Sequence, residues 1–461
     1  MENGKWKNRL LLGAIIISGV LLLIYFIIAV YFTNHFYYGS AINCISVSGM
    51  SVNEVKNELP NEVEKYSLKL IGRDNINEII NGNDIDLQLS INKDIEEIKD
   101  NSQNPLGWIT SLFTNHNINE EEMITFNEEK LKDKIKKLNI VIGENIIEPK
   151  NASYIFENGQ YKIVTEIPGS KINQDNLYKE IIGAISSGER EINLEEKDCY
   201  EKPKYKSDSE EIIETRDTLN DYVNTEISYK FGDKIETIDK SIIGTWLHID
   251  DYNNITFNKE EINKYLQTIC SKYNTVGKTR QFSTSTGEVI KVSGGDYGWS
   301  INKKIECEEL INIIKESKPV TKEPSYLQKA DNHSGQDFGN TYIEINLQSQ
   351  YLWFYKNGNI IAEGSIVTGD IYNGCATPAG VYSLKYKERN AILRGEDYET
   401  PVSFWMPFNN GIGVHDAVWR SVFGGNIYMG NGSHGCVNAS YTMAESIFNN
   451  IEPGTAVICY N

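Results

Sequence analysis

The sequence predicts an α+β protein with a single transmembrane helix, two α+β repeat domains and a C-terminal, mostly-β domain. Three patterns support this: an uncharged apolar run near the N-terminus, a repeated strand-and-helix motif, and closely spaced strand patterns at the end. A chain of 461 residues corresponds to about three domains. Hydrophobic residues at 40% and aromatic residues at 11% supply enough apolar surface for folded cores.

The apolar run extends from Leu10 to Phe32 without a charged residue. At about 1.5 Å per residue a helix of this length reaches roughly 34 Å, which exceeds a hydrocarbon core of about 30 Å. The run therefore predicts a transmembrane helix over residues 10–32.

Basic residues indicate the orientation of this helix. Lys5, Lys7 and Arg9 precede it, and the next Lys or Arg is Lys56. By the positive-inside rule, residues 1–9 form a cytoplasmic tail and everything after Phe32 lies outside the cell membrane. A cleavable signal peptide is the alternative, but the run exceeds the usual apolar region of about 7 to 15 residues and no small-x-small site follows.

Composition argues against several classes of ligand. A formal charge of −19 repels phosphate backbones, so we expect no nucleic-acid partner. Seven widely spaced cysteines form no C-x-x-C pair and no Cys/His cluster at zinc spacing. We expect no metal and no cofactor, and most of the cysteines are expected to be small buried hydrophobes.

A repeat occupies the middle of the chain. Ile124-Thr125-Phe126-Asn127 and Ile255-Thr256-Phe257-Asn258 each precede an amphipathic helical pattern. In the first copy Leu131, Ile135 and Leu138 share one helix face. We predict two α+β domains, residues 33–205 and 206–317.

Residues 318–339 lack periodicity and are predicted to be a linker. From residue 340 to 461 short strand patterns alternate with turn pairs, which predicts the mostly-β domain. Its one expected helix covers residues 441–450, and a last strand covers 456–460. The charged stretch 386–401 is predicted to be a hairpin or lid, or an ordinary solvated loop.

Two of the six histidines lie near one cysteine in this last domain. His415 precedes Cys436 by 21 residues, and His434 precedes it by two. A cysteine attacks as thiolate, so it needs a base nearby and donors for the oxyanion that forms. Gly435 allows close approach of the backbone, and amides beside Cys436 are suited to an oxyanion. The alternative is a buried structural cysteine.

These residues resemble the signature of the L,D-transpeptidases of bacterial peptidoglycan. In this sequence His415 is separated by 17 residues from Ser433-His434-Gly435-Cys436-Val437-Asn438. The similarity extends over about residues 340–461 and includes TPAGVY at 377–382 and SFWMPF at 403–408.

The resemblance implies a role for each signature residue. Cys436 would be the nucleophile and His415 its base. Asp416 would orient the imidazole through its carbonyl or side chain. His434, Gly435 and Cys436 would line the oxyanion hole.

Other residues are predicted to bind substrate. Ser433 belongs to this group, and Asn438 is expected to brace the loop. Arg420 would hold a substrate carboxylate, or form a surface ion pair. The aromatic segment Phe404, Trp405 and Met406 would wall the acyl-donor groove, or belong to the core.

The second repeat, around residues 231–301, resembles a peptidoglycan-binding domain, and the first is similar to a diverged copy. Whether the repeats bind glycan or act as spacers stays open.

The implied reaction needs neither metal nor cofactor. Cys436 would attack the third residue of a peptidoglycan stem peptide, expel the terminal D-alanine and pass the acyl group to a second stem, giving a 3→3 crosslink. Acylation by β-lactams, carbapenems above all, is also implied.

Four alternatives remain: an L,D-carboxypeptidase, a sortase-like transpeptidase, a papain-like endopeptidase and a non-catalytic wall-binding anchor. A sortase would have His and Cys further apart and an Arg after the Cys. A papain-like enzyme would place Cys before His.

Overall fold

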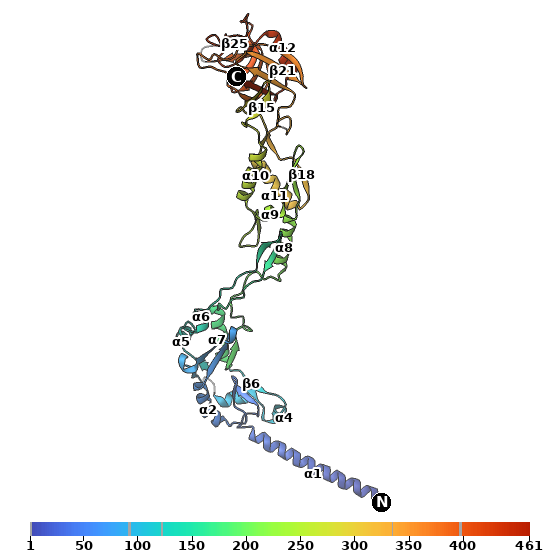
Figure 1. Ribbon diagram of the computed structural model, residues 1–461. Coiled ribbons are helices and arrows are strands. Elements are labelled where there is room, and N and C mark those ends of the chain that lie inside the picture. Colours follow the sequence, from blue (N-terminus) through green and yellow to red (C-terminus); the bar gives the residue numbers. More distant parts are fainter. Residues whose placement is uncertain (1, 91–93, 121–122, 334, 396–398) are drawn as a thin grey trace. The chain divides into compact units, whose positions relative to one another are not determined.

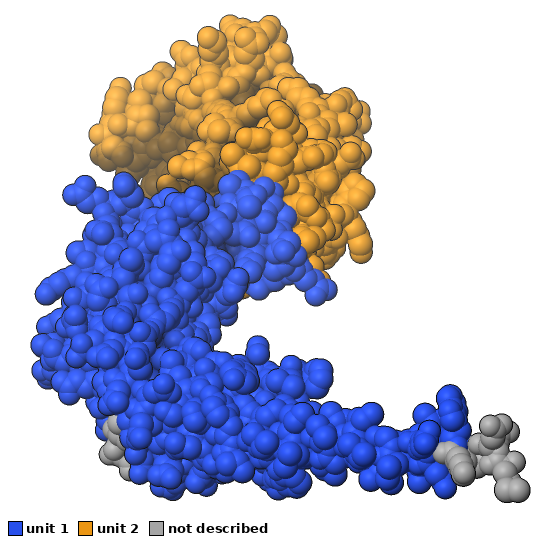
Figure 2. Space-filling view, turned by 90° about the horizontal axis from the view of Figure 1, so that it is seen from below, with its two compact units in different colours: residues 1–154, 163–212 blue, residues 155–162, 213–461 orange. Residues whose placement is uncertain are grey.

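The chain forms two compact units in a computed structural model that describes residues 2–90, 94–120, 123–333, 335–395 and 399–461. Unit 1 comprises residues 1–154 and 163–212, and unit 2 comprises residues 155–162 and 213–461 (Figure 2). Each unit is described by itself below.

Unit 1 begins with a long helix and continues as small sheets packed against helices (Figure 1). Its elements are α1 (Glu2–Tyr31), β1 (Ser40–Ile42), β2 (Ile45–Ser46), α2 (Val52–Glu64), β3 (Ser67–Ile71), η1 (Arg73–Asn75), β4 (Asn77–Asn81), η2 (Gly82–Ile85), β5 (Gln88–Leu89), α3 (Ile95–Ser102), η3 (Pro105–Gly107), α4 (Trp108–Ser111), β6 (His116–Ile118), β7 (Ile124–Thr125), α5 (Glu128–Ile135), α6 (Asn139–Ile142), α7 (Gln174–Ser187) and β10 (Glu191–Asn193).

Helix α1 covers the apolar run as far as Tyr31, one residue short of its expected end, and it starts before the run, since residues 2–9 of the expected tail are already helical. Met1 lies outside the described residues. The stretch Trp6–Tyr31 is long and apolar enough to cross a membrane, a property that signal sequences share.

The repeated Ile-Thr-Phe-Asn motif has the same structural meaning in both copies. Its asparagine caps the helix that follows: Asn127 accepts from the amides of Glu129 and Lys130 at the start of α5. Asn258 does the same for α10 (Lys259–Tyr273) in unit 2. A side-chain acceptor at this position satisfies amides that a helix start leaves unpaired.

Three elements cross the division between the units: β8 (Ser153–Glu157), β9 (Gln160–Val164) and α8 (Glu210–Val223). The second repeat in unit 2 contains β11 (Ile227–Phe231), β12 (Lys234–Ile238), α9 (Lys240–Gly244), β13 (Leu247–Ile249), β14 (Ile255–Phe257), α10, β15 (Arg280–Ser283), β16 (Val289–Val292), β17 (Ser300–Ile301), α11 (Lys303–Glu316), β18 (Val320–Lys322) and β19 (Tyr326–Gln328).

The segment 318–339, expected to be a linker, differs from that expectation. It contains β18, which pairs in parallel with β11, and β19, which pairs with β17. Asp337 is buried and accepts from the Arg280 guanidinium, with Nε 2.7 Å from Oδ1. Three-residue strands are too short to show a period of two, so the sequence pattern did not reveal them.

The C-terminal part of unit 2 is rich in strands, as predicted. Its elements are β20 (Tyr342–Asn346), β21 (Tyr351–Lys356), β22 (Asn359–Ser365), β23 (Gly380–Ser383), β24 (Glu388–Arg394), β25 (Glu399–Asn409), β26 (Ile412–Asp416), β27 (Val437–Ala439), α12 (Tyr441–Asn450) and β28 (Ala456–Tyr460).

Two sheets make up this domain. One has the order β22-β21-β20-β28-β23 and the other the order β24-β25-β26-β27. Inward side chains from both sheets pack with α12 in one core, to which Met443, Ala444, Ile447 and Phe448 contribute the helix face. The expected hairpin at 386–401 is β24 and β25, and residues 396–398 lie outside the described residues.

All seven cysteines are free thiols, and Cys199, Cys270, Cys307 and Cys459 are buried.

Candidate active site

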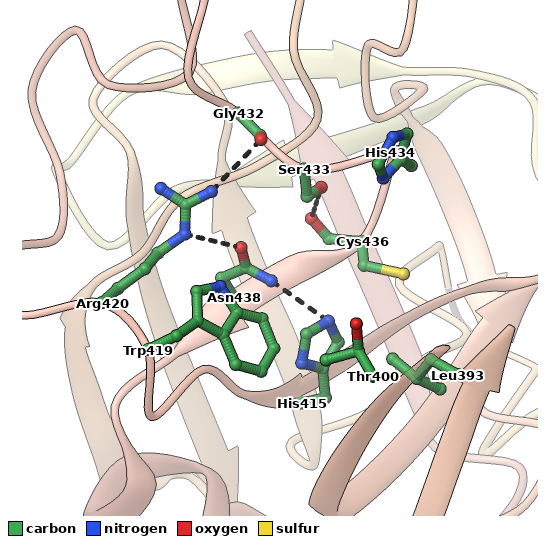
Figure 3. Close-up of a pocket in the computed structure, with 10 residues that line it drawn as sticks. All are labelled: Leu393, Thr400, His415, Trp419, Arg420, Gly432, Ser433, His434, Cys436 and Asn438. Atoms are coloured by element: carbon green, nitrogen blue, oxygen red, sulfur yellow. Dashed lines mark hydrogen bonds between the residues drawn. The ribbon is translucent and has the colours of Figure 1, made fainter. Parts of the chain in front are cut away.

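The two ends of the signature meet because β26 and β27 are neighbours. They pair in parallel with His415 opposite Asn438, and β25 places Trp405 opposite His415 on the other side. Sequence separation of more than 20 residues thereby becomes direct contact between side chains (Figure 3).

A pocket of about 210 Å³ opens at this point (Figure 3). It is lined by Leu393, Thr400, His415, Trp419, Arg420, Gly432, Ser433, His434, Cys436 and Asn438. Six of these are residues that the sequence singled out, and the pocket brings them together.

The tautomer of the buried His415 follows from its partners. Its Nδ1 lies 2.8 Å from the carbonyl oxygen of Asp416, which only accepts, so Nδ1 carries the proton. Its Nε2 lies 3.1 Å from Nδ2 of Asn438 and accepts from that amide. Asn438 is oriented in turn by Arg420, whose Nε donates to Oδ1 at 3.0 Å.

Both reacting groups are uncharged at rest. Burial lowers the pKa of His415, partly offset by the Asp416 carbonyl, so the imidazole stays neutral. Burial raises the pKa of the Cys436 thiol to about 11. The thiol points at the carbonyl oxygen of Gly411, 3.5 Å away.

Trp405 contributes to that burial through an apolar cluster. It forms a cluster with Ala391 and Val402, against which Leu393 and Cys436 pack. It does not line the pocket.

The backbone before Cys436 is held in an unusual conformation. Gly435 has φ of 121°, which favours glycine, and a Cβ there would lie 3.2 Å from Ile412. Its amide donates to Ser433 Oγ at 3.1 Å, and that hydroxyl donates to the Cys436 carbonyl at 2.5 Å. Thr377 Oγ1 donates to the Gly435 carbonyl at 2.7 Å.

Asp370 fixes the turn that leads into the signature. Its Oδ1 accepts from the Gly430 amide at 3.1 Å and its Oδ2 from the Gly432 amide at 3.3 Å. Burial raises the pKa of this carboxyl, but hydrogen bonds from Asn373 and the neighbouring amides outweigh it and lower the pKa. A carboxylate is therefore the stable form.

Phe404 and Met406 were predicted either to wall the acyl-donor groove or to belong to the core, and the groove alternative is wrong. Both are fully buried in the core between the sheets, so they do not wall a groove. Successive side chains of β25 point to opposite faces, and these two share the inner one.

Asp416 and Arg420 have partners within the protein. The Asp416 side chain accepts from the amides of Ser403 and Phe404, both at 2.8 Å, so only its carbonyl meets the imidazole. Arg420 is half-buried and donates from Nη2 to the Gly432 carbonyl at 3.2 Å as well as to Asn438. His434 is exposed at the pocket rim.

Sequence reasoning missed Trp419, Leu393 and Thr400 in the pocket wall, and Thr377 and Asp370 behind it. Trp419 lies four residues after His415 in a loop, and no periodic pattern in the sequence marks it as a site residue. In the described part of the chain, no group of three or more His, Cys, Asp or Glu is arranged to hold a metal ion.

Two family models match the chain. The model described as "L,D-transpeptidase catalytic domain" matches residues 340–459. The model described as "Putative peptidoglycan binding domain" matches residues 80–193 and 205–322. The chain belongs to the L,D-transpeptidase family. Its role is that of a transpeptidase acting on peptidoglycan, as the resemblance implied.

Solved L,D-transpeptidases are similar to this one. A cysteine-to-serine mutant of the Enterococcus faecium enzyme is 31% identical over 54% of this chain and 100% of that chain, with a TM-score of 0.46. The E. faecium catalytic domain acylated by ertapenem is 39% identical over 26% of this chain and 98% of that chain, with a TM-score of 0.25. A Mycobacterium tuberculosis L,D-transpeptidase is 22% identical over 26% of this chain and 58% of that chain, with a TM-score of 0.24. No curated protein matches the chain.

Proposed function

We propose that Cys436 is the nucleophile of a transpeptidase that forms 3→3 crosslinks between stem peptides. The thiol proton passes to Nε2 of His415 as Sγ bonds to the carbonyl carbon of the third stem residue. The C–N bond to the terminal D-alanine breaks, and the imidazolium returns the proton to the leaving amine. An acceptor amine then attacks the thioester, loses a proton to His415 and releases the thiol.

The observation that carries this proposal is the state of His415. Its Nδ1–H donates to the Asp416 carbonyl, so Nε2, which accepts from the Asn438 amide at rest, is the nitrogen that can take the thiol proton, and Cys436 lies in the same pocket. A neutral imidazole is the form that can accept a proton. One amide replaces another, so the exchange needs no oxidant and no metal.

We assign the Cys436 amide to the oxyanion hole. The Gly435 amide already donates to Ser433 Oγ, so its role is to shape the turn that presents its neighbour. A backbone donor aimed at developing charge is worth about 10²- to 10³-fold in rate.

Mass analysis of products tests the reaction. The full-length enzyme, incubated with a tetrapeptide stem as donor and a second stem as acceptor, should yield the crosslinked dimer and free D-alanine. Cys436→Ala should yield neither. A tripeptide without dimer would identify an L,D-carboxypeptidase, and an active Cys436→Ala would exclude the thiol mechanism.

We propose further that carbapenems acylate Cys436, as ertapenem acylates the E. faecium catalytic domain. The β-lactam carbonyl would react with the thiol and open the ring without loss of atoms. Intact-mass measurement should show one added carbapenem on the wild type and none on Cys436→Ala. An unmodified but active wild type would contradict this.

We also propose that α1 is retained as an anchor in the cell membrane and that the catalytic domain faces the wall. The two repeats would then bind peptidoglycan between anchor and catalyst. Labelling of intact cells with a membrane-impermeant reagent should modify the catalytic domain, and N-terminal sequencing of the mature protein should find α1 still attached.

A further inference from the structure

A stretch of unit 1 next to α1 is free of charge. Residues 101–119 contain no Asp, Glu, Lys or Arg, although these types make up 24% of the whole chain. The short helices η3 and α4 lie in this stretch, within the apolar segment 105–113. An uncharged surface segment is unusual in a protein this acidic, and the proposed function does not use it.

Segment 105–113 packs against the outer end of α1. The facing stripe consists of Tyr25, Ile28 and Ala29 of the helix and of Phe32 directly after it, at the spacing of one helix face. The indole Nε1 of Trp108 donates to the Tyr25 carbonyl at 3.2 Å, and its ring stacks on Phe32 with centroids 6.4 Å apart.

Polar contacts fix this arrangement at the membrane end of the unit. Gln103 Nε2 donates to the His35 carbonyl at 2.7 Å, and its Oε1 accepts from the Tyr37 amide at 3.0 Å. The Tyr25 hydroxyl donates to the Leu106 carbonyl. The segment is therefore held beside the helix at a set level and is not a free loop.

The segment also presents an exposed apolar face. Leu106, Ile109, Leu112 and Phe113 form this face, and Phe113 is 84% exposed. An apolar groove of about 370 Å³ lies between the face and α1, and it is lined by Ile27, Ile28, Tyr31, Phe32, Tyr38, Trp108 and Leu112.

The position of segment 105–113 along α1 places it at the depth of the lipid bilayer. Tyr25 lies seven residues before Phe32, where the apolar run ends, which is about 10 Å at 1.5 Å per residue. A run of roughly 34 Å exceeds the hydrocarbon core by only a few ångströms, so Tyr25 and its contact Trp108 fall inside or at the edge of the outer leaflet. Tyr and Trp are the residues enriched at that depth.

We infer that segment 105–113 inserts its apolar face into the outer leaflet of the lipid bilayer beside α1. This rests on the proposed membrane anchor and adds a second point of contact. Two contacts fix the tilt of unit 1 on the membrane, which one helix alone leaves free. An amphipathic surface element lying in the interface buries its apolar side chains among acyl chains in the same way.

Depth measurement tests the inference on the full-length protein. The protein is reconstituted in vesicles of phosphatidylglycerol and phosphatidylcholine in equal amounts. A nitroxide is attached through an unnatural amino acid at position 113, 142 or 20, which leaves the native thiols untouched. Collision rates with oxygen, which concentrates in lipid, and with a water-soluble nickel chelate give the depth of each label.

Position 142 is the matched control, because Ile142 is an apolar residue of unit 1 that is 63% exposed and lies outside the uncharged stretch. The ratio of oxygen to nickel collisions should be several-fold higher at 113 than at 142, and highest at 20. If 20 is deep while 113 matches 142, the anchor stands and the inference is overturned. If 113 is shielded from both reagents, a protein contact covers it and the inference is again overturned. An aqueous label at 20 refutes both the anchor and the inference.

A paired variant supplies a second readout. Leu112→Glu with Phe113→Glu should shift a label at 109 toward water, because carboxylates are excluded from acyl chains. Ile142→Glu should not. Since all three side chains are exposed, circular dichroism should report an unchanged fold, and an unmoved label at 109 would overturn the inference.

Discussion

Two histidines stand near Cys436, and their surroundings separate their roles. His415 is buried with both ring nitrogens engaged, whereas His434 is exposed at the rim. His415→Gln should lower turnover by about 10²- to 10⁴-fold, the usual loss when a general base is removed. His434→Gln keeps the backbone and should retain most of the activity. Steady-state assays with soluble stem peptides compare the two, and equal losses would refute the assignment of the base.

The protonation of the resting site gives a pH dependence. Because burial raises the pKa of Cys436 to about 11, alkylation of this thiol should accelerate by about tenfold per pH unit until that pH is approached. Because burial lowers the pKa of His415, kcat/KM should fall only at pH values below the ordinary 6.5. Peptide mapping after timed iodoacetamide treatment measures the alkylation rate of Cys436. A plateau of alkylation near neutral pH would instead reveal a preformed thiolate–imidazolium pair.

At the scale of elements, the hydroxyl of Thr377 is one of the groups through which the loop 369–377 supports the signature turn. Thr377 Oγ1 accepts from the Gly369 amide at 3.0 Å and donates to the Gly435 carbonyl. Thr377→Val keeps the shape but leaves both groups buried without a partner, at a cost of about 1 to 3 kcal/mol. We expect lower thermal stability and a lower kcat with little change in KM.

Thr377→Ser is the matched control, since it restores the hydroxyl and removes only a methyl group. Its kcat should return toward the wild-type value. If the valine and serine variants behave alike, packing and not the hydrogen bond holds the turn.

Sequence patterns predicted some elements well and others poorly, for physical reasons. The helix 441–450 and the strand 456–460 were predicted with the observed bounds because their apolar faces are continuous. The aromatic pattern of segment 403–408 predicts one role for all its side chains, although a strand sends alternate side chains to opposite faces. Phe404 and Met406 therefore belong to the core, while Trp405 belongs to the separate cluster against which Cys436 packs.

The candidate site was predictable where the chemistry is local in sequence. His415, Ser433, His434, Cys436 and Asn438 line one pocket, as the motif suggested. Partners that arrive from distant loops, such as Thr377 and Asp370, carry no local pattern. Only the register of β26 with β27 and the path of the loops bring them near Cys436.

At the scale of unit 2, the second repeat is built into the catalytic domain. The hairpin β15–β16 and its following loop share an apolar cluster with the last strands: Phe282, Val292, Tyr297, Phe338, Val381, Ala456, Ile458 and Tyr460. Polar contacts reinforce it, because the buried Glu344 of β20 accepts from the Ser285 amide at 2.9 Å and from the Tyr460 hydroxyl at 2.6 Å. The Asp296 carboxylate accepts from the Ser383 amide at 3.0 Å.

This shared cluster predicts that a residue of the repeat stabilises the catalytic domain. Phe282 is buried, and Phe282→Ala should cost about 3 to 5 kcal/mol, as large-to-small changes of buried phenylalanine do. Phe231 is equally buried but stacks on Tyr273 within the repeat, so Phe231→Ala is the matched control. The temperature at which half the turnover of soluble stem peptides is lost should fall markedly for Phe282→Ala and little for Phe231→Ala. Equal temperatures for Phe282→Ala and the wild type would mean that the hairpin only rests on the catalytic domain, and the repeats would then be spacers without influence on the enzyme they carry.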